Sequence, residues 1–188
     1  MKDRQYGPLE AIRRDHTERY RFAASKIPKG SKVLDLACGC GYGSWILHEA
    51  GMKVTGADIE PEAISYAEKN YPGPAYIRKA AEEIEGQYDA IVTFETLEHI
   101  YYPGSILKAI QAPLVIASVP NEERYKFLPK AFEGDKYPHL RHYTPTEFEQ
   151  LLNGSGLMVV ERFCQKDKHG DVEPGTDGVF LISVCTRI

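Results

Sequence analysis

The stretch Val33-Leu34-Asp35-Leu36-Ala37-Cys38-Gly39-Cys40-Gly41-Tyr42-Gly43 decides the fold of this chain. It runs from a hydrophobic strand, through one carboxylate, into a turn rich in glycine. A turn whose main chain lies against a ligand leaves no room for Cβ atoms, so Gly39, Gly41 and Gly43 predict a nucleotide-like cofactor held by backbone atoms. A helix predicted over residues 44–50 puts this turn at a helix N-terminus, where phosphate or ribose groups bind.

Two kinds of nucleotide site compete for this turn. A dinucleotide fingerprint, G-x-G-x-x-G, needs a third glycine where the chain has Ser44, and it gives Asp35 no role. Val33-Leu34-Asp35 followed by Gly39-x-Gly41 instead resembles the first motif of class I S-adenosylmethionine (SAM) dependent methyltransferases. SAM is therefore the predicted cofactor. An NAD-dependent enzyme and a turn without a ligand are the less favoured alternatives.

The resemblance continues beyond the turn. Asp58 ends a predicted strand over 53–58, roughly 20 residues after the glycines, where a carboxylate can hold a ribose diol. The alternative for Asp58 is an N-cap of the next helix. The family usually has an Asp after its third strand to bind the adenine amino group, but this chain has Lys79-Ala80-Ala81-Glu82 there. The implied SAM contacts are Asp35, Ala37, Gly39, Gly41, Asp58, Ile59, Ala81, Glu82 and Glu95.

Strands and helices alternate along the chain, which is typical of a mainly parallel sheet with helices on both faces. The resemblance implies an α/β, Rossmann-like, doubly wound sheet of seven strands with an antiparallel last strand. A single methyltransferase domain is predicted over 1–188, with a helical lead-in at 1–30 and a substrate roof at 120–143. After the opening strand, the strands are predicted at 53–58, 75–78, 88–94, 113–119, 157–163 and 179–184.

Composition agrees with one globular domain. The chain has 188 residues, of which 43% are hydrophobic and 27% charged, and its net charge is -4, so nonspecific nucleic-acid binding is not expected. No run of 18 apolar residues and no apolar signal core are present, which predicts a cytoplasmic protein without a membrane partner. The four cysteines form no C-x-x-C pair and are expected to be reduced.

The block Glu95-Thr96-Leu97-Glu98-His99 is the second strong signal. In a helical turn, positions i, i+3 and i+4 project from one face, so the two carboxylates and the imidazole can converge. Oxygen and nitrogen ligands together suit a divalent metal. On this block alone, helix capping and a hydrogen-bonded pocket lining are the favoured alternative.

A downstream histidine strengthens the metal prediction. The segment Tyr137-Pro138-His139-Leu140-Arg141-His142-Tyr143 precedes a predicted helix over 145–152. Glu-x-x-Glu-His followed by such a histidine resembles small-RNA 3′-terminal 2′-O-methyltransferases, and ubiquinone-pathway O-methyltransferases carry a similar Glu-x-x-Glu-His. The resemblance implies Mg²⁺, Mn²⁺ or a similar ion with ligands Glu95, Glu98, His99 and His139, although His142 is interchangeable with His139.

These observations predict methyl transfer from SAM to an oxygen of a small hydroxylated or glycan-like acceptor, with a metal activating the hydroxyl. His142 or His99 would take the proton, and His99 alone would serve as the base without a metal. The alternatives are a metal-free N-methyltransferase, an RNA 2′-O-methyltransferase acting on an RNA terminus, and a non-catalytic SAM-binding partner subunit. The loop over 164–178 is interpreted as an exposed turn or as a contributor to substrate choice.

Overall fold

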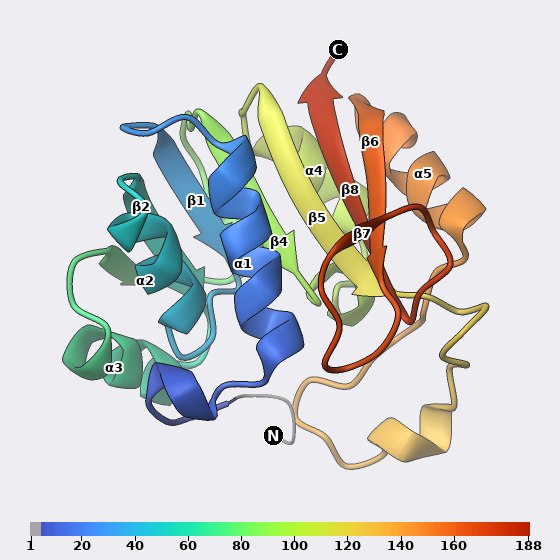
Figure 1. Ribbon diagram of the computed structural model, residues 1–188, viewed down its shortest axis with the longest axis horizontal. Coiled ribbons are helices and arrows are strands. Elements are labelled where there is room, and N and C mark those ends of the chain that lie inside the picture. Colours follow the sequence, from blue (N-terminus) through green and yellow to red (C-terminus); the bar gives the residue numbers. More distant parts are fainter. Residues whose placement is uncertain (1–4) are drawn as a thin grey trace.

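The strands form one sheet in the order β3-β2-β1-β4-β5-β8-β6-β7 (Figure 1). This computed structural model describes residues 5–188, so the first four residues of the predicted lead-in lie outside the described part of the chain. The strands are β1 Lys32–Leu36, β2 Lys53–Asp58, β3 Ala75–Arg78, β4 Ala90–Phe94, β5 Leu114–Pro120, β6 Leu157–Gln165, β7 Glu173–Pro174 and β8 Phe180–Arg187. The α-helices are α1 Arg14–Lys26, α2 Tyr42–Glu49, α3 Pro61–Asn70, α4 Pro103–Ala109 and α5 Pro145–Gly154; short 3₁₀ helices are η1 Leu9–Ala11, η2 Ala81–Glu83, η3 Leu97–His99 and η4 Pro129–Phe132.

Five neighbouring strands, β3, β2, β1, β4 and β5, run parallel. Strand β8 is antiparallel to both of its neighbours, β5 and β6. The predicted doubly wound, mainly parallel sheet with an antiparallel last strand is therefore confirmed. The strand order reverses between β1 and β4, and open sheets of this kind bind ligands outside the carboxyl ends of the strands at such a point.

The sheet has one strand more than the seven predicted. Strand β7 consists of two residues within the stretch interpreted as a turn, and it pairs with β6 at Phe163 and Cys164. It lies at the edge of the sheet, where Pro174 is tolerated because a proline has no N–H to donate to a further strand.

Side chains of β1 alternate between the two faces of the sheet. Val33 packs in the cluster that includes α1 and α2, whereas Leu34 and Leu36 pack in the cluster that includes α4 and α5. Figure 1 shows α1 crossing one face and α4 lying behind the sheet. Asp35 therefore points toward the side of α1 and α2, in the interior of the protein.

The lead-in is not one continuous helix. The helical lead-in predicted over 1–30 is divided, because Ile12 and Arg13 between η1 and α1 do not have helical backbone torsions. Ile12 is buried, and the Arg13 amide donates to Gln5 Oε1 at 2.6 Å. None of the helices within residues 5–188 is both long enough and apolar enough to cross a membrane.

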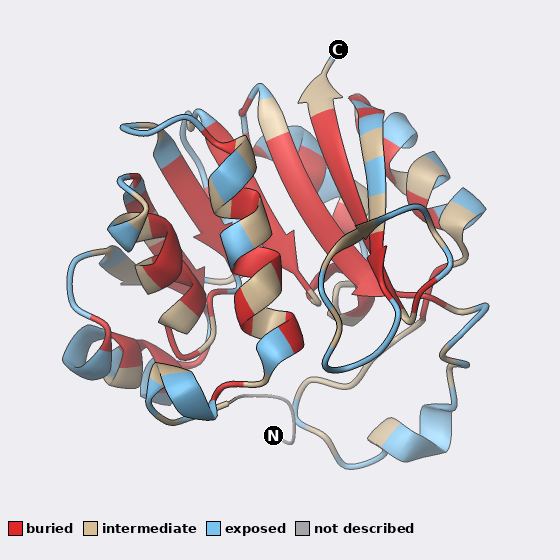
Figure 2. Ribbon diagram, viewed as in Figure 1, coloured by how far each residue is buried: buried red, intermediate tan, exposed pale blue. Residues whose placement is uncertain are grey.

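The predicted roof, residues 120–143, leaves the sheet after β5 and returns to it before α5. Its ends lie together, since the Glu122 amide donates to the Tyr143 carbonyl at 2.9 Å and the Tyr143 amide donates to the Pro120 carbonyl at 3.2 Å. Figure 2 shows that the central strands are largely buried whereas η4 in this segment is largely exposed. The segment is thus a loop closed at its base and projecting beyond the strand ends.

Candidate active site

A cavity of about 370 Å³ opens at the carboxyl ends of the parallel strands. Its walls come from the glycine turn, the segments after β2, β3 and β4, helix α1 and the roof. The predicted SAM contacts in the wall are Ala37, Gly39, Asp58, Ile59, Ala81, Glu82 and Glu95. The structure therefore brings most of the predicted cofactor residues together at one cavity.

The glycines of the turn serve different purposes. In the described chain, Gly39 is the one of the three that borders the cavity. A Cβ on Gly41 would lie 2.5 Å from the Cβ of Ala67, and one on Gly43 would lie 2.0 Å from the Tyr20 ring. Packing of α3 and α1 against the turn requires these two glycines. The structure therefore does not support the expectation that all three clear space for a ligand.

Asp35 lies behind the cavity wall. Its fully buried carboxylate accepts hydrogen bonds from the Tyr20 hydroxyl at 3.0 Å and the Ser44 hydroxyl at 2.6 Å. Burial raises the pKa of Asp35 to about 6, although both hydroxyls oppose the rise. Asp35 thus ties β1 to α1 and α2, a role that its place in the first motif did not indicate.

Asp58 borders the cavity and also supports its wall. Asp58 Oδ2 accepts from the Gly39 amide and Oδ1 accepts from the Glu60 amide, both at 2.9 Å. The first bond joins β2 to the glycine turn, and the second closes a turn just before α3. The N-cap of α3 is Glu60, so Asp58 does not cap this helix as the alternative expected. The carboxylate is 4% exposed, at the edge of the cavity where a ribose diol can reach it.

Glu95 follows β4 and belongs to a buried ionic network. Its Oε1 lies 2.8 Å from an Arg19 guanidinium nitrogen and accepts from the Ser118 hydroxyl at 2.8 Å. Arg19 is 1% exposed and also contacts the Asp15 carboxylate at 3.3 Å. Glu95 adopts φ +50°, a conformation that costs energy for a residue with a Cβ. This network fixes α1 to the strand ends.

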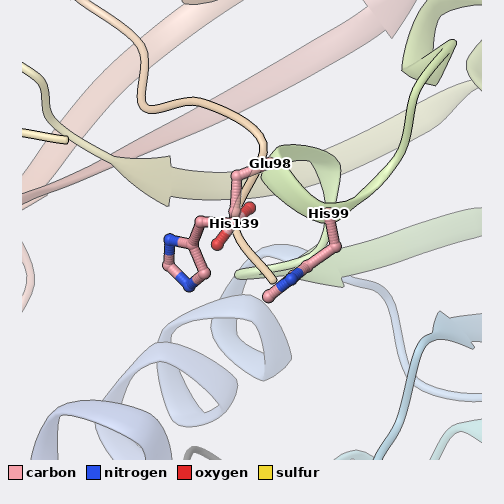
Figure 3. A group of neighbouring side chains, drawn as sticks. All are labelled: Glu98, His99 and His139. Atoms are coloured by element: carbon pink, nitrogen blue, oxygen red, sulfur yellow. The ribbon is translucent and has the colours of Figure 1, made fainter. Parts of the chain in front are cut away.

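Glu98, His99 and His139 form one compact group (Figure 3). The first two come from η3 after β4, and His139 comes from the roof. One ligand atom from each of the three lies within 4.8 Å of the other two. Glu98 is fully buried, whereas His99 and His139 line the cavity. Of the four predicted metal ligands, the structure thus brings these three together, while Glu95 is engaged by Arg19.

His142 lies behind His139. Its Nδ1 is 2.6 Å from the Tyr125 carbonyl oxygen and its Nε2 is 2.9 Å from His139 Nδ1. A carbonyl can only accept, so His142 Nδ1 carries the proton and its Nε2 accepts from His139 Nδ1–H. This leaves a lone pair on Nε2 of His139. His99 Nδ1 lies 3.2 Å from the Pro138 carbonyl oxygen. This nitrogen therefore also carries the proton, and the lone pair of His99 is on Nε2.

Burial keeps His139 and His142 neutral near neutral pH. Burial, with His99 and His142 close by, lowers the pKa of His139 to about 3. Burial also lowers the pKa of His142, although the Tyr125 carbonyl opposes this shift. A metal ligand is a neutral imidazole, so His139 can offer its lone pair to an ion near neutral pH, whereas a pKa of about 3 makes it a weak proton acceptor.

A family model described as a methyltransferase domain matches residues 9–162. The chain belongs to this methyltransferase family. The prediction of a class I methyltransferase is thereby confirmed, and the family supports SAM as the cofactor.

Among solved structures, the methyltransferase resembles CcbJ from Streptomyces caelestis, with a TM-score of 0.75 and 16% identity over 97% of this chain and 93% of that one. It also resembles magnesium protoporphyrin IX methyltransferase from Synechocystis with bound SAH (S-adenosylhomocysteine), with a TM-score of 0.71 and 16% identity over 98% and 90% of the two chains. At this identity the likeness concerns the fold.

Curated relatives include ubiquinone biosynthesis O-methyltransferases. The relative from Bordetella avium is 31% identical over 116 residues, 57% of this methyltransferase and 48% of that protein. The one from Aeromonas salmonicida is 29% identical over 153 residues, 69% of this chain and 64% of the other. An uncharacterized methyltransferase from Synechocystis is 36% identical over 77 residues, 39% and 36% of the two chains. The methyltransferase therefore matches about half of the length of such relatives.

The donor set of the Glu98 group fits a divalent transition metal. It offers a carboxylate oxygen and two imidazole nitrogens. The Pro138 carbonyl fixes the tautomer of His99, and His142, itself held by the Tyr125 carbonyl, fixes that of His139. Mg²⁺ prefers oxygen ligands and imidazole suits transition ions, so within the predicted range this set favours an ion such as Mn²⁺ over Mg²⁺. The residues that would hold the ion are Glu98, His99 and His139.

Several cavity residues were missed by the sequence prediction. Lys136 of the roof lies 2.6 Å from the Glu60 carboxylate beside Asp58, and Arg13 reaches the cavity from the start of α1. Phe132 stacks on the His139 ring with centroids 4.1 Å apart. Phe132 lies within the predicted roof. Lys136 could not be assigned from the sequence, because its partner Glu60 is distant in the chain, and the nearby pair of Arg13 with Asp15 gave no indication of a cavity.

Proposed function

We propose that this methyltransferase transfers the methyl group of SAM to a hydroxyl oxygen of a small hydroxylated or glycan-like acceptor, assisted by a divalent metal. The observation that carries the proposal is the convergence of Glu98, His99 and His139 at the cavity. The relatives named ubiquinone biosynthesis O-methyltransferases support oxygen as the accepting atom.

In this proposal the cavity has two halves. The glycine turn, Asp58 and the segment 79–82 form the cofactor half, because they follow β1, β2 and β3. Asp58 would accept from the ribose diol, and Ala81 with Glu82 would meet the adenine. The acceptor half lies between His99, His139 and the roof. Its walls include Tyr101, Tyr125 and Phe132, whose rings shield the reacting atoms from water.

A bound metal would supply Lewis-acid activation of the acceptor hydroxyl, lowering its pKa. Glu98 would provide the buried negative charge, and the Nε2 lone pairs of His99 and His139 would complete the protein ligands. His142 would hold the His139 ring in the required tautomer through Tyr125. The roof would fix the acceptor oxygen in line with the methyl group, and positioning of this kind can lower a barrier by several kcal/mol.

A metal-free base mechanism is the second candidate, and the hydrogen bond of His99 favours it. Because the Pro138 carbonyl accepts from Nδ1–H, Nε2 of His99 carries the lone pair that would take a proton in the cavity. In this candidate, Glu98 would stabilise the imidazolium that forms. The two candidates predict opposite effects of removing metal ions.

The test measures methyl transfer to catechols, sugars, amines and an RNA with a free 3′ end. Each reaction is run after exhaustive EDTA treatment and again after adding Mn²⁺, Mg²⁺ or Zn²⁺. We expect catechol or sugar O-methylation that EDTA abolishes and Mn²⁺ restores. Full activity after EDTA would overturn the proposed metal assistance and favour His99 as the base. Methylation of amines or RNA alone would overturn the proposal that the acceptor is a small hydroxylated or glycan-like compound.

Thermal stabilisation by SAH serves as the control for folding and cofactor binding. Glu98→Gln and His139→Ala are expected to keep this stabilisation and to lose methyl transfer by at least about 100-fold. A protein that SAH stabilises but that methylates no acceptor would instead be a SAM-binding partner subunit. Stabilisation by NAD and not by SAH would overturn the proposal as a whole.

A further inference from the structure

The loop between β6 and β8, residues 166–179, reaches over the acceptor half of the cavity. Lys168 of this loop lines the cavity, and its ammonium lies 5.6 Å from the centroid of the Tyr125 ring. Tyr125 in turn packs against His142, with ring centroids 4.8 Å apart, and His142 is hydrogen-bonded to His139. The ammonium and the group proposed to activate the acceptor hydroxyl therefore border one cavity, and Tyr125 and His142 lie between them.

The acids of this loop are engaged elsewhere. Asp167 Oδ1 accepts from the backbone amide two residues on at 2.7 Å. Asp171 pairs with Arg14 of α1, and Asp177 pairs with Arg124 of the roof. These contacts anchor the loop to α1 and the roof on either side of the cavity, so the chain that carries Lys168 is held in place.

The two lysines of the loop, Lys166 and Lys168, differ in whether they form an ion pair. Lys166 lies 2.7 Å from the Glu173 carboxylate, outside the cavity. In the described chain, residues 5–188, Lys168 has no carboxylate partner, and its cation–π contact with Tyr125 leaves most of the ammonium accessible. An ammonium held at a cavity wall without an anion offers a site for an anion that arrives with a ligand.

The other cations of the cavity cannot fill this role. Arg13 and Arg19 bind the Asp15 carboxylate, and Lys136 binds Glu60. Lys79 follows β3 and lies in the cofactor half. Lys168 is thus the available positive charge of the acceptor half within residues 5–188.

We propose that Lys168 binds a carboxylate of the acceptor, so that the acceptor is a hydroxylated acid and not a neutral alcohol. The inference rests on the proposed function for the place of the acceptor, and it narrows the substrate class to a vicinal diol with a nearby anionic group. Two kinds of compound share this chemistry: an aromatic acid such as 3,4-dihydroxybenzoate, and a sugar acid such as glucuronate. Tyr125 would contact the ring while Lys168 pairs with the carboxylate.

The test measures binding to the SAH-loaded protein in the presence of EDTA, by calorimetry, so that turnover and metal do not enter. The probes are 3,4-dihydroxybenzoate, glucuronate and their neutral amides, 3,4-dihydroxybenzamide and glucuronamide. Each is titrated into the wild type, Lys168→Met and Lys166→Met. The last variant is the matched control, because Lys166 is an exposed lysine of the same loop outside the cavity.

We expect one of the two acids to bind about tenfold more tightly than its amide, as for a hydrogen bond to a charged group. Lys168→Met should remove this difference without changing amide binding, and Lys166→Met should leave it intact. The acid that shows the preference identifies the aromatic or the sugar source.

Equal binding of both acids and their amides, or no binding of any probe, would overturn the proposal. A preference for acid that survives in Lys168→Met, or that Lys166→Met also removes, would overturn it as well. Failure of the proposed function is recognised separately, by the absence of SAH binding or by methyl transfer to no hydroxyl in the acceptor panel.

Discussion

His139 Nδ1 donates to His142 Nε2 across 2.9 Å, so the imidazole at the cavity is oriented by an imidazole behind it. The predicted proton acceptor His142 is buried, and it contacts the cavity residue His139 instead of lining the cavity. Since the Tyr125 carbonyl fixes the proton of His142 on Nδ1, His142 determines which nitrogen of His139 keeps its lone pair. His142 is therefore a positioning residue in the proposed reaction.

Two substitutions of His142 distinguish its proposed role in orienting His139 from a role in packing alone. His142→Phe should lower kcat by about 10- to 100-fold, as for loss of an outer-shell partner of a metal ligand. His142→Gln should retain most activity, because its amide can donate to the Tyr125 carbonyl and accept from His139. Steady-state kinetics of methyl transfer, with SAH-induced stabilisation as the folding control, measures both.

Equal activity of the two His142 variants would contradict the positioning role. A matched check is the Mn²⁺ concentration needed for half-maximal activity. It should rise in His142→Phe and stay near the wild-type value in His142→Gln, whereas a merely structural role would leave it unchanged wherever the protein folds.

Asp35 makes the stability of the fold depend on pH. Its pKa is about 6 in the folded protein against an ordinary value of 3.8 for an exposed aspartate, so the folded state binds this proton more strongly than the unfolded state. The stability from this proton is complete below pH 3.8 and is lost as the pH rises through 6. A shift of this size corresponds to about 3 kcal/mol in the free energy of unfolding.

Urea unfolding of the wild type and Asp35→Asn between pH 4 and 8 measures this effect. The wild type should lose up to about 3 kcal/mol relative to Asp35→Asn across that range. Ser44→Ala should move the loss to higher pH, because the Ser44 hydroxyl lowers the pKa of Asp35. A pH-independent difference between the wild type and Asp35→Asn would refute this account.

Gly41 is predicted to matter for packing more than Gly39 does. Gly41→Ala combines a left-handed φ of +87° with a Cβ 2.5 Å from Ala67, so it should cost about 2 to 4 kcal/mol of stability. Gly39→Ala has φ +55° and nothing within 4 Å of its Cβ, so it should cost about 1 to 2 kcal/mol. Urea unfolding without cofactor ranks the two, and equal losses would contradict the packing argument.

The alternation of strand and helix patterns was enough to predict a mainly parallel sheet, whereas its antiparallel last strand was predicted from the family resemblance. The apolar strands β2 and β3 begin and end at the predicted residues, because Gly and Pro interrupt the chain between periodic segments. Strand β7 was not predictable in this way. It is two residues long, and it forms because the chain after Gln165 folds back beside Phe163.

The residues of the site could be predicted from spacing only where they lie close together in the sequence. Glu98 and His99 are neighbours in sequence, so the block Glu95 to His99 already placed them at one site. The predicted helical turn does not include Glu95, because η3 begins at Leu97 and Glu95 has φ +50°. His139 could be assigned only through a resemblance, because 40 residues separate it from His99. Arg19 of α1 forms an ion pair with Glu95, which follows β4. No spacing in the sequence could show that Glu95 pairs with this arginine and does not join the histidines.

The ion pair between Lys136 and Glu60 is expected to slow release of the methylated cofactor product. Lys136 Nζ lies 2.6 Å from Glu60 Oε2, and this contact joins the roof to the segment after Asp58. Lys136 is 57% exposed, so the pair contributes modestly and is screened by salt. Lys136→Met should raise the dissociation rate of SAH about two- to fivefold.

Stopped-flow displacement of SAH tests this expectation, with Lys130→Met as the control because Lys130 is an exposed roof lysine outside the cavity. Added salt should accelerate release from the wild type and have little effect on Lys136→Met. Glu60→Gln should match Lys136→Met, and the double variant should add nothing further, since one contact is removed in each case. If Lys136→Met and Lys130→Met release SAH at the wild-type rate, the ion pair does not restrain the roof.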